Sequence, residues 1–404
     1  MKPAAAEAVA GGSGHGERYP YWRLSSFYAF YFALLGAWLP FWPLYLKELG
    51  YGAAAIGALV GTMQLTKVVA PSVWGWLADR SGARLRVIRA GGLAALLAFL
   101  CIFLIDPAAA QGGFVPLALI IVGYSFFWNA VLAQFEVVTL AHLGARYRRY
   151  SLVRVWGSVG FIAAVAGLGF AFDRIALHWL PAVVAALLAG MWFSTLSVGE
   201  ATASVRGAAK AAMPLGRLLR RPAVMAFFAA CFLLQFSHGP YYTFLSVYLE
   251  MHGYSRGPTG LLWSLGVVAE VVLFLVMHRL LARFTLRQIL LASLALTALR
   301  WLLIGAWVDV LPLLIFAQCL HAASFASYHA AAVELVRTLF AGGNEGQGMA
   351  LYSGISYGAG AASGALVSGL LWTVNPAFAF ASATLASALA VVIGWRWLRP
   401  SEPG

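Results

Sequence analysis

Twelve long apolar runs constrain the fold of this chain more than any other feature. About 20 residues at 1.5 Å each cross the hydrocarbon core of a bilayer as a helix, and each run is about that long. With 62% hydrophobic and only 10% charged residues among 404, the chain has more apolar surface than a soluble fold can bury. We therefore expect an all-α integral membrane protein. Its predicted spans are 23–46, 54–77, 87–106, 113–137, 151–172, 176–197, 222–249, 258–278, 288–308, 311–335, 345–372 and 376–397.

The sequence also contains an internal duplication at an offset of 203 positions. Identical residues at this offset are Gly36/Gly239, Phe41/Phe244, Tyr45/Tyr248, Leu46/Leu249, Gly50/Gly253, Tyr51/Tyr254 and Gly57/Gly260. Six spans in each copy predict two pseudo-symmetric six-helix bundles, an arrangement typical of secondary transporters. The expected organisation is an N-terminal tail, a bundle, a linker, a second bundle and a C-terminal tail, at residues 1–22, 23–197, 198–221, 222–397 and 398–404.

The basic residues indicate how these spans are oriented. The net charge is +13, and 21 of the 27 Lys and Arg residues fall in the termini, in the alternate connections after spans 2, 4, 6, 8 and 10, or at the span ends that adjoin them. By the positive-inside rule, both termini are expected on the cytoplasmic side. The charge thus reflects membrane topology, and we expect no nucleic-acid partner. The first twenty residues lack the apolar stretch of a cleavable signal peptide, so the first span is expected to direct insertion.

The residue types that support catalysis are not arranged as in known enzymes. Cys101, Cys231 and Cys319 are odd in number, lie in apolar runs and have no Cys-x-x-Cys spacing, which argues against a disulfide framework or a metal site. There is no His-box, Ser-His-Asp set or nucleotide-binding loop. We expect neither an enzyme nor a cofactor or metal.

A charged motif follows the second span. From Gly75 to Arg84 the sequence reads Gly-Trp-Leu-Ala-Asp-Arg-Ser-Gly-Ala-Arg. This run resembles the loop motif Gly-x-Leu-Ala-Asp-Arg-x-Gly-x-Arg of the major facilitator superfamily, which implies that superfamily's fold of twelve helices in two bundles. In a very short loop, such charges can clamp neighbouring helix ends and release them when the helices move. The expected gating residues are Gly75, Asp79, Arg80, Gly82 and Arg84.

The second copy of the motif is incomplete. It retains Arg279, Arg283 and Arg287, but Ala282 occupies the Asp position. We therefore expect the clamp on one side only.

Titratable side chains lie inside the apolar runs, where a charge costs roughly 2.5–3.5 kcal/mol or more. Three helical hairpins place two such residues equally far from the connecting loop, and therefore at equal depth. The pairs are Glu136 with Arg154, His238 with Glu270, and Arg300 with His321. In the duplication, Lys67 falls opposite Glu270. A fixed structural strut is an alternative for Glu136 and Arg154, and Glu334 lies near the water-exposed end of its span.

A closer resemblance covers nearly the whole chain. It is similar to the phenylpropionate permease branch of the superfamily, itself related to the proton-coupled lactose and nucleoside symporters, in segments Arg154–Ser158, Gly260–Glu270, Leu299–Trp301 and Leu320–Phe325 and at His329. The lactose permease pattern implies substrate binding by Glu136, Arg154 and Glu270, and proton coupling and substrate binding by Arg300 and His321. Ser324 stands where that pattern has a carboxylate. We therefore expect Glu270 to carry the coupling proton.

Together these features predict a symporter of the bacterial inner membrane that moves a small, aromatic carboxylate with a proton by alternating access, as a monomer among membrane lipids. The expected proton-coupling residues are Glu270, His238, His321 and Arg300. The expected substrate-binding residues are Lys67, Glu136, Arg154, Asn129, Tyr241, Tyr242, Trp263 and His329. A sugar or nucleoside proton symporter and a proton-driven exporter are the alternatives within transport. A non-transporting sensor does not explain three charge pairs in the membrane.

Overall fold

The computed structural model describes residues 19–105, 113–200 and 214–398, and in these ranges every regular element is a helix. Eleven helical segments there are long and apolar enough to cross a membrane. One of them, Phe114–Phe172, has 59 residues and consists of two helices joined by the 3₁₀ turn η3, Gly144–Arg149. Counted separately, these two helices complete the twelve predicted spans and confirm the all-α membrane fold.

The first half has six spans, each built around one α-helix. These are α1 (Tyr21–Glu48), α2 (Ala53–Ser81), α3 (Arg84–Leu100, extended by η1, Cys101–Leu104), α4 (Phe114–Leu143), α5 (Tyr150–Phe172) and α6 (Leu180–Leu196, preceded by η4, Leu177–Trp179). Part of the predicted linker, 201–213, lies outside the described residues. The described end of the linker contains the short helix α7 (Leu215–Leu219).

Three of the six spans in the second half are interrupted. The intact spans are α10 (Arg256–Arg283), α11 (Leu286–Trp307) and α16 (Pro376–Trp397). The interrupted spans are α8 (Pro222–Ser237) with α9 (Gly239–Met251), α12 (Leu311–Cys319) with η5 (Ala322–Ser327) and α13 (Tyr328–Leu339), and α14 (Glu345–Tyr352) with η6 (Ser353–Gly360) and α15 (Ala361–Val374). The elements η5 and η6 are π-helical. Such irregular turns within a helix are frequent at functional sites.

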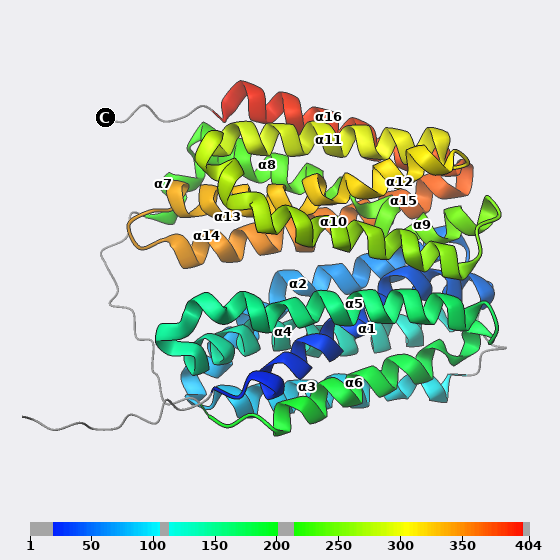
Figure 1. Cartoon of the computed structure of the whole chain (residues 1–404), viewed down its shortest axis with the longest axis horizontal. Coiled ribbons are helices and arrows are strands. Elements are labelled where there is room, and N and C mark those ends of the chain that lie inside the picture. Colours follow the sequence, from blue (N-terminus) through cyan, green and yellow to red (C-terminus); the bar gives the residue numbers. More distant parts are fainter. Residues whose placement is uncertain (1–18, 106–112, 201–213, 399–404) are drawn as a thin grey trace, which may run out of the picture.

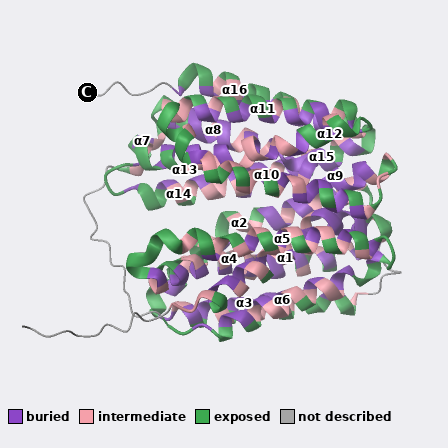
Figure 2. Ribbon diagram, viewed as in Figure 1, coloured by how far each residue is buried: buried purple, intermediate pink, exposed green. Residues whose placement is uncertain are grey.

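The two halves lie side by side as separate bundles (Figure 1). They come together at the end where α1 meets α2 and α9 meets α10, and they diverge toward the end where α4 joins α5. Buried residues concentrate where the halves meet (Figure 2). One hydrophobic core there contains residues of both halves, including Trp42 and Trp372, whereas a second core around Phe227 and Tyr352 belongs to the second half alone.

The duplication is visible in the contacts between the halves. Gly57 and Gly260 occupy equivalent positions, and each lets its helix approach the opposite half closely. A Cβ at Gly57 would lie 2.6 Å from the carbonyl oxygen of Ala365, and one at Gly260 would lie 2.4 Å from that of Val165. Because any other residue adds a Cβ there, only glycine permits these two crossings. The two equivalent close approaches agree with the duplicated sequence.

Asp173 connects the two halves at the end where they come together, which we call the closed end. It follows α5, and its carboxylate accepts hydrogen bonds from the backbone N–H groups of Arg256 (2.8 Å) and Gly257 (2.9 Å), in the first turn of α10. A negative charge at a helix N-terminus is stabilising because it meets free N–H groups and the positive end of the helix dipole. The guanidinium of Arg256 also pairs with Glu48. The first half therefore caps a helix of the second half.

The motif expected as a loop is mostly helical, which corrects the predicted end of the second span at residue 77. Helix α2 continues through Gly75 and Asp79 and ends at Ser81, because Gly82 has a φ of 62°. Glycine adopts this left-handed conformation without a Cβ clash and so terminates the helix. Asp79 therefore lies on the last turn of α2, and the connection to α3 is only two residues long.

Candidate functional site

Arg300 is fully buried in the second half and is held by neutral groups. Its Nε donates to the Ala317 carbonyl oxygen (3.1 Å), and Nη1 donates to Ser324 Oγ (2.9 Å). Nη2 donates to Gln318 Oε1 at 3.3 Å, and the guanidinium lies 4.2 Å from the ring centre of Tyr241. Ser324, which departs from the lactose permease pattern, thus supplies a hydroxyl to Arg300 in place of a carboxylate.

The hydrogen bond between Arg300 and His321 fixes where the imidazole carries its hydrogen. Arg300 Nη1 lies 3.0 Å from His321 Nδ1. A guanidinium has no acceptor, so Nδ1 must accept and the hydrogen of the neutral ring is on Nε2. That Nε2 faces the carboxylate of Glu270 at 3.6 Å. The geometry therefore links Glu270, His321 and Arg300 in one series, with Glu270 at its outer end.

Glu270 also faces ionisable groups of both bundles. It interacts electrostatically with Arg154 of α5 and with His329 of α13. Arg154 in turn interacts with Glu136 of α4. One arginine of the first half therefore interacts with a carboxylate of each half. Helices α5 and α10, which carry Arg154 and Glu270, pack against each other along the interface.

Two of the three predicted pairs differ in the structure. The pair of Arg300 with His321 forms, as the hairpin spacing predicts. Glu136 accepts a hydrogen bond from Tyr150 (3.0 Å), while the Arg154 guanidinium lies 3.9 Å from the centre of the Phe32 ring. Glu136 and Arg154 thus interact electrostatically at a distance, without the direct contact of an ion pair.

His238 does not pair with Glu270. Its Nδ1 lies 2.8 Å from the Leu234 carbonyl oxygen, and its Nε2 is buried without a hydrogen-bond partner. The helical span is interrupted at this residue, between α8 and α9. The ring packs edge-on against Trp301 and does not contact Glu270 of α10. The prediction failed because equal depth does not bring two helices together: α10 packs mainly against α5, η5 and α12 and hardly against α8 or α9.

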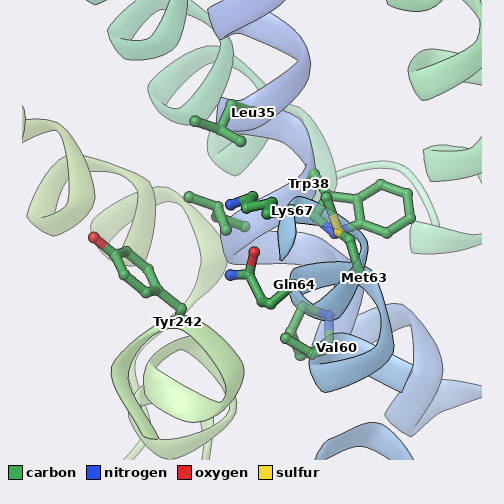
Figure 3. A pocket seen from close by; sticks show the side chains of 9 residues that line it. Leu35, Trp38, Val60, Met63, Gln64, Lys67 and Tyr242 are labelled. Carbon is green, nitrogen blue, oxygen red and sulfur yellow. The ribbon is translucent and has the colours of Figure 1, made fainter. Parts of the chain in front are cut away.

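Lys67 lies at the interface in an apolar setting (Figure 3). Its surroundings include Trp38 of α1, Gln64 of α2 and Tyr242 of α9, around a cavity of about 20 Å³. Within the described part of the chain, the Lys67 ammonium has no hydrogen bond or ion pair. A cavity of this size holds about one water molecule, so it does not by itself accommodate a solute.

The remaining predicted binding residues have varied surroundings. Asn129 donates to Thr66 Oγ1 (2.8 Å), next to Lys67 in the chain, and so joins α4 to α2. Tyr241 and Trp263 are buried inside the second half, with ring centres 4.6 Å apart. The Tyr241 ring contacts the Arg300 guanidinium, and Trp263 packs against Tyr241. Tyr242, by contrast, lines the cavity at Lys67.

His329 belongs to a polar cluster that the sequence analysis did not identify. Its Nδ1 lies 3.2 Å from the hydroxyl of Tyr352 and 3.1 Å from that of Tyr357. The two tyrosines come from the interrupted span of α14, η6 and α15. Gln318, which accepts from both Tyr241 (3.1 Å) and Arg300, was likewise missed. The sequence signal that could have indicated a partner such as Gln318 is a polar residue close in the chain to a predicted titratable residue.

The gating residues lie at the diverging end, and their hydrogen bonds, ion pair and ring contact among the described residues are all with their own half. Arg84 pairs with Asp79 and donates from Nη1 to Gln134 of α4 at 2.5 Å. The Arg80 guanidinium lies 5.4 Å from the centre of the Trp76 ring on the same helix. The second copy differs, since Arg287 donates to the carbonyl oxygen of Trp395 (2.7 Å).

Comparisons of sequence identify related proteins along nearly the whole chain. The family described as MFS_1 like family matches residues 21–382. Over 361 residues the chain is 30% identical to the Escherichia coli (strain K12) protein named "Probable 3-phenylpropionic acid transporter". The aligned region covers 87% of this chain and 90% of that protein. The chain is 26% identical over 364 residues to the maltose permease of Geobacillus stearothermophilus, covering 88% and 89%.

Solved structures share the same arrangement of helices. The crystal structure of nucleoside transporter NupG superposes with a TM-score of 0.75 at 18% identity, covering 94% of this chain and 98% of that chain. The crystal structure of D-xylose-proton symporter gives a TM-score of 0.70 at 11% identity, covering 93% and 97%. At these identities the likeness shows the fold alone.

Proposed function

The chain belongs to the MFS_1 like family of membrane transporters, and from this premise we propose that it imports a small aromatic carboxylate together with a proton. The observation that carries the proposal is the series of Glu270, His321 and Arg300, which ends in a carboxylate facing Arg154 of the opposite half. Such a series couples the protonation of one residue to contacts between the two bundles.

Glu270 is the member of this series suited to gain and lose a proton. Arg300 is always charged, and its bond to Nδ1 requires that His321 keep this nitrogen unprotonated. The carboxylate of Glu270, whose side chain is 17% exposed, has room to accept a proton or to pair with a cation. When Glu270 is neutral, Arg154 is free to pair with the carboxylate of a solute. Substrate and proton binding would then favour each other.

The cations and rings near the interface favour an aromatic acid. Lys67 has no counter-ion among the described residues, and Arg154 rests on the face of Phe32. A carboxylate can pair with either cation, while rings such as Tyr242 and Trp38 offer apolar surface to an aromatic body. The relative named for 3-phenylpropionic acid supports the same class of solute.

We further assign the two bundles, 23–197 and 222–397, as the units that rock around this site in a monomer surrounded by lipid. Both termini and the linker 198–221 would face the cytoplasm, as the distribution of basic residues favours. In that orientation the ends joined by Asp173 and Arg256 are extracytoplasmic. The described conformation is then closed to the outside and opens inward.

Transport by the purified protein in proteoliposomes tests the proposal. With an inward proton gradient, labelled 3-phenylpropionate should accumulate, a protonophore should abolish accumulation, and uridine and maltose should compete poorly. Lys67→Gln should raise the KM for the acid, whereas Lys67→Arg, which retains the cation, should raise it less. Gradient-driven uptake of uridine or maltose without uptake of the acid would replace the proposed substrate, and acid loss under the opposite gradient would indicate an exporter.

A further inference from the structure

A groove on the outer surface of the second half is separate from the transport site. It has a volume of about 440 Å³, which is within the roughly 300–1,000 Å³ of typical ligand pockets. Leu273 and Leu280 of α10 line one side, Ala292 and Leu296 of α11 the other, and Ala323 and Ser327 of η5 the floor. No acidic residue is among the described residues that line it.

The packing of three helices explains where this groove opens. Helices α10 and α11 barely touch each other, yet each packs against η5 and α12. Figure 1 shows α12 and α13 running between α11 and α10. Because the floor is the span that both helices contact, the mouth faces away from that span. At this depth, the groove opens toward the hydrocarbon of the membrane.

Three polar side-chain atoms in the groove, Ser293 Oγ, Ser327 Oγ and Gln288 Oε1, form hydrogen bonds within the protein. Ser293 and Ser327 hydrogen bond to each other at 2.7 Å. Gln288 accepts at Oε1 from the backbone N–H (2.9 Å) and the hydroxyl (3.0 Å) of Thr285, as part of a capping box. With those groups paired, the groove offers an apolar lining and little reason to hold water. Its occupant should be hydrocarbon.

Two unpaired cations lie at the end of this groove. Arg279 and Arg283 precede and follow Leu280, within one helical turn, near the connection from α10 to α11. Both are exposed, and within the described residues neither has a hydrogen bond or ion pair. They therefore offer two positive charges beside an apolar groove, at the end of the span that meets the lipid headgroups.

The duplicated motif supplies no carboxylate here. In the first half, Arg84 pairs with Asp79. The second half has Ala282 at the position of Asp79 and Arg287 at that of Arg84, so the motif places no acid beside Arg279 and Arg283. A phosphate group can supply the missing negative charge and accept several charge-assisted hydrogen bonds.

We propose that this groove binds one anionic phospholipid, with an acyl chain between α10 and α11 and the phosphate on Arg279 and Arg283. The site requires both features of that ligand. Its apolar groove accommodates a chain, and its two arginines select a negative headgroup over a zwitterionic one. None of the residues that line it belongs to the proposed transport site.

Native mass spectrometry of the full-length protein in detergent tests this proposal. One copy of dioleoyl phosphatidylglycerol should stay bound to the protein more strongly than one copy of dioleoyl phosphatidylcholine. The double variant Arg279→Gln/Arg283→Gln should weaken binding of phosphatidylglycerol roughly tenfold, because each basic residue adds to the attraction for anionic lipid. The matched control Arg148→Gln/Arg149→Gln removes two exposed arginines between α4 and α5 and should leave the affinity unchanged.

A second variant tests the groove independently of charge. Ala292→Trp fills it and should weaken binding of the dioleoyl lipid, while dihexanoyl phosphatidylglycerol, whose chains are short, should bind almost as before. Equal binding of the two headgroups, or equal losses in both double variants, would overturn the proposal. So would displacement of the lipid by 3-phenylpropionate, because the groove would then be a site for the solute.

Discussion

Lys47 Nζ lies 2.7 Å from Glu250 Oε2, although these two residues occupy equivalent positions in the two halves. They are 203 residues apart, which is the offset of the duplication. A residue and its counterpart can meet in this way only near the pseudo-two-fold axis that relates the halves. Opposite charges at one duplicated position have thus made a contact that holds the closed end together.

Reversing one of these charges should open the closed end. Lys47→Glu places a third acid beside Glu48 and Glu250, so repulsion replaces attraction. Because the pair is partly exposed, with side chains 44% and 35% accessible, the equilibrium should shift by no more than about fivefold. Spin labels at Ala176 and Val374, on opposite halves at this end, should show more of the longer distances.

The double reversal Lys47→Glu/Glu250→Lys should restore part of the closed population. Arg174→Glu is the matched control, since among the described residues Arg174 donates only to the Phe170 carbonyl oxygen of its own half (3.4 Å). If Arg174→Glu shifts the distances as much as Lys47→Glu, the contact has no specific role.

Asp79→Asn should slow transport and leave the affinity for substrate within a few-fold. Among the residues that the structure describes, Asp79 pairs only with Arg84, at the diverging end and away from Glu270. The change should therefore alter the interconversion of conformations rather than the site. Initial uptake rates and equilibrium binding measured on the same preparation separate these effects.

Arg84→Gln provides the companion experiment. Because Asp79 and Arg84 act as one pair, the double variant should be no slower than the slower single variant. Additive losses would show that the two residues act separately, and a parallel loss of binding would argue against a gating role.

Gly157→Ala should weaken substrate binding without unfolding the protein. A Cβ at Gly157 would lie 2.6 Å from Arg154 Nη1 and 2.7 Å from the Phe32 ring. The guanidinium must then leave its place on that ring. Thermal-shift titration with 3-phenylpropionate should show reduced affinity, with the melting temperature of the unliganded protein little changed.

Gly167→Ala is the control on the same helix, because a Cβ there meets nothing within 4 Å. Both changes replace a helical glycine by alanine, so both alter helix propensity alike. Unchanged affinity in Gly157→Ala would show that substrate binding does not depend on the position of Arg154.

Hairpin spacing predicted one contact of the candidate site and missed others for a geometric reason. Counting from a connecting loop relates only consecutive helices, and so it identified Arg300 with His321. Glu270 of α10 meets His321, which lies between α12 and η5 in a span that does not directly follow α10, and it faces Arg154 across the two halves. These contacts depend on how the bundles fold and dock, which local spacing does not determine.

The irregular spans were equally hidden. His238 lies at a break before Gly239 and Pro240, so its ring points away from α10. Tyr357 lies in a run rich in glycine and serine whose π-helical form brings its hydroxyl to His329. By contrast, the twelve spans and the duplication were predictable, because they depend on hydropathy and identity along the chain alone.

Glu270→Gln should abolish proton-driven accumulation and retain exchange of substrate. The amide is neutral and nearly isosteric, so it imitates a permanently protonated carboxylate facing His321 Nε2. Exchange requires the loaded carrier to reorient but never to release its proton, whereas net uptake requires both steps. Counterflow of labelled 3-phenylpropionate, measured without a gradient, should therefore continue while accumulation under a proton gradient stops.

Two controls make this result specific to Glu270. Glu334→Gln neutralises an exposed glutamate paired with Arg337 at 3.4 Å and should leave both activities intact. His321→Gln should impair exchange as well, because it removes the imidazole between Arg300 and Glu270. Accumulation that survives in Glu270→Gln would exclude this residue from coupling, and loss of exchange together with binding would instead make it a substrate ligand. In that second case, the pH dependence of exchange in His321→Gln would decide whether the imidazole carries the proton.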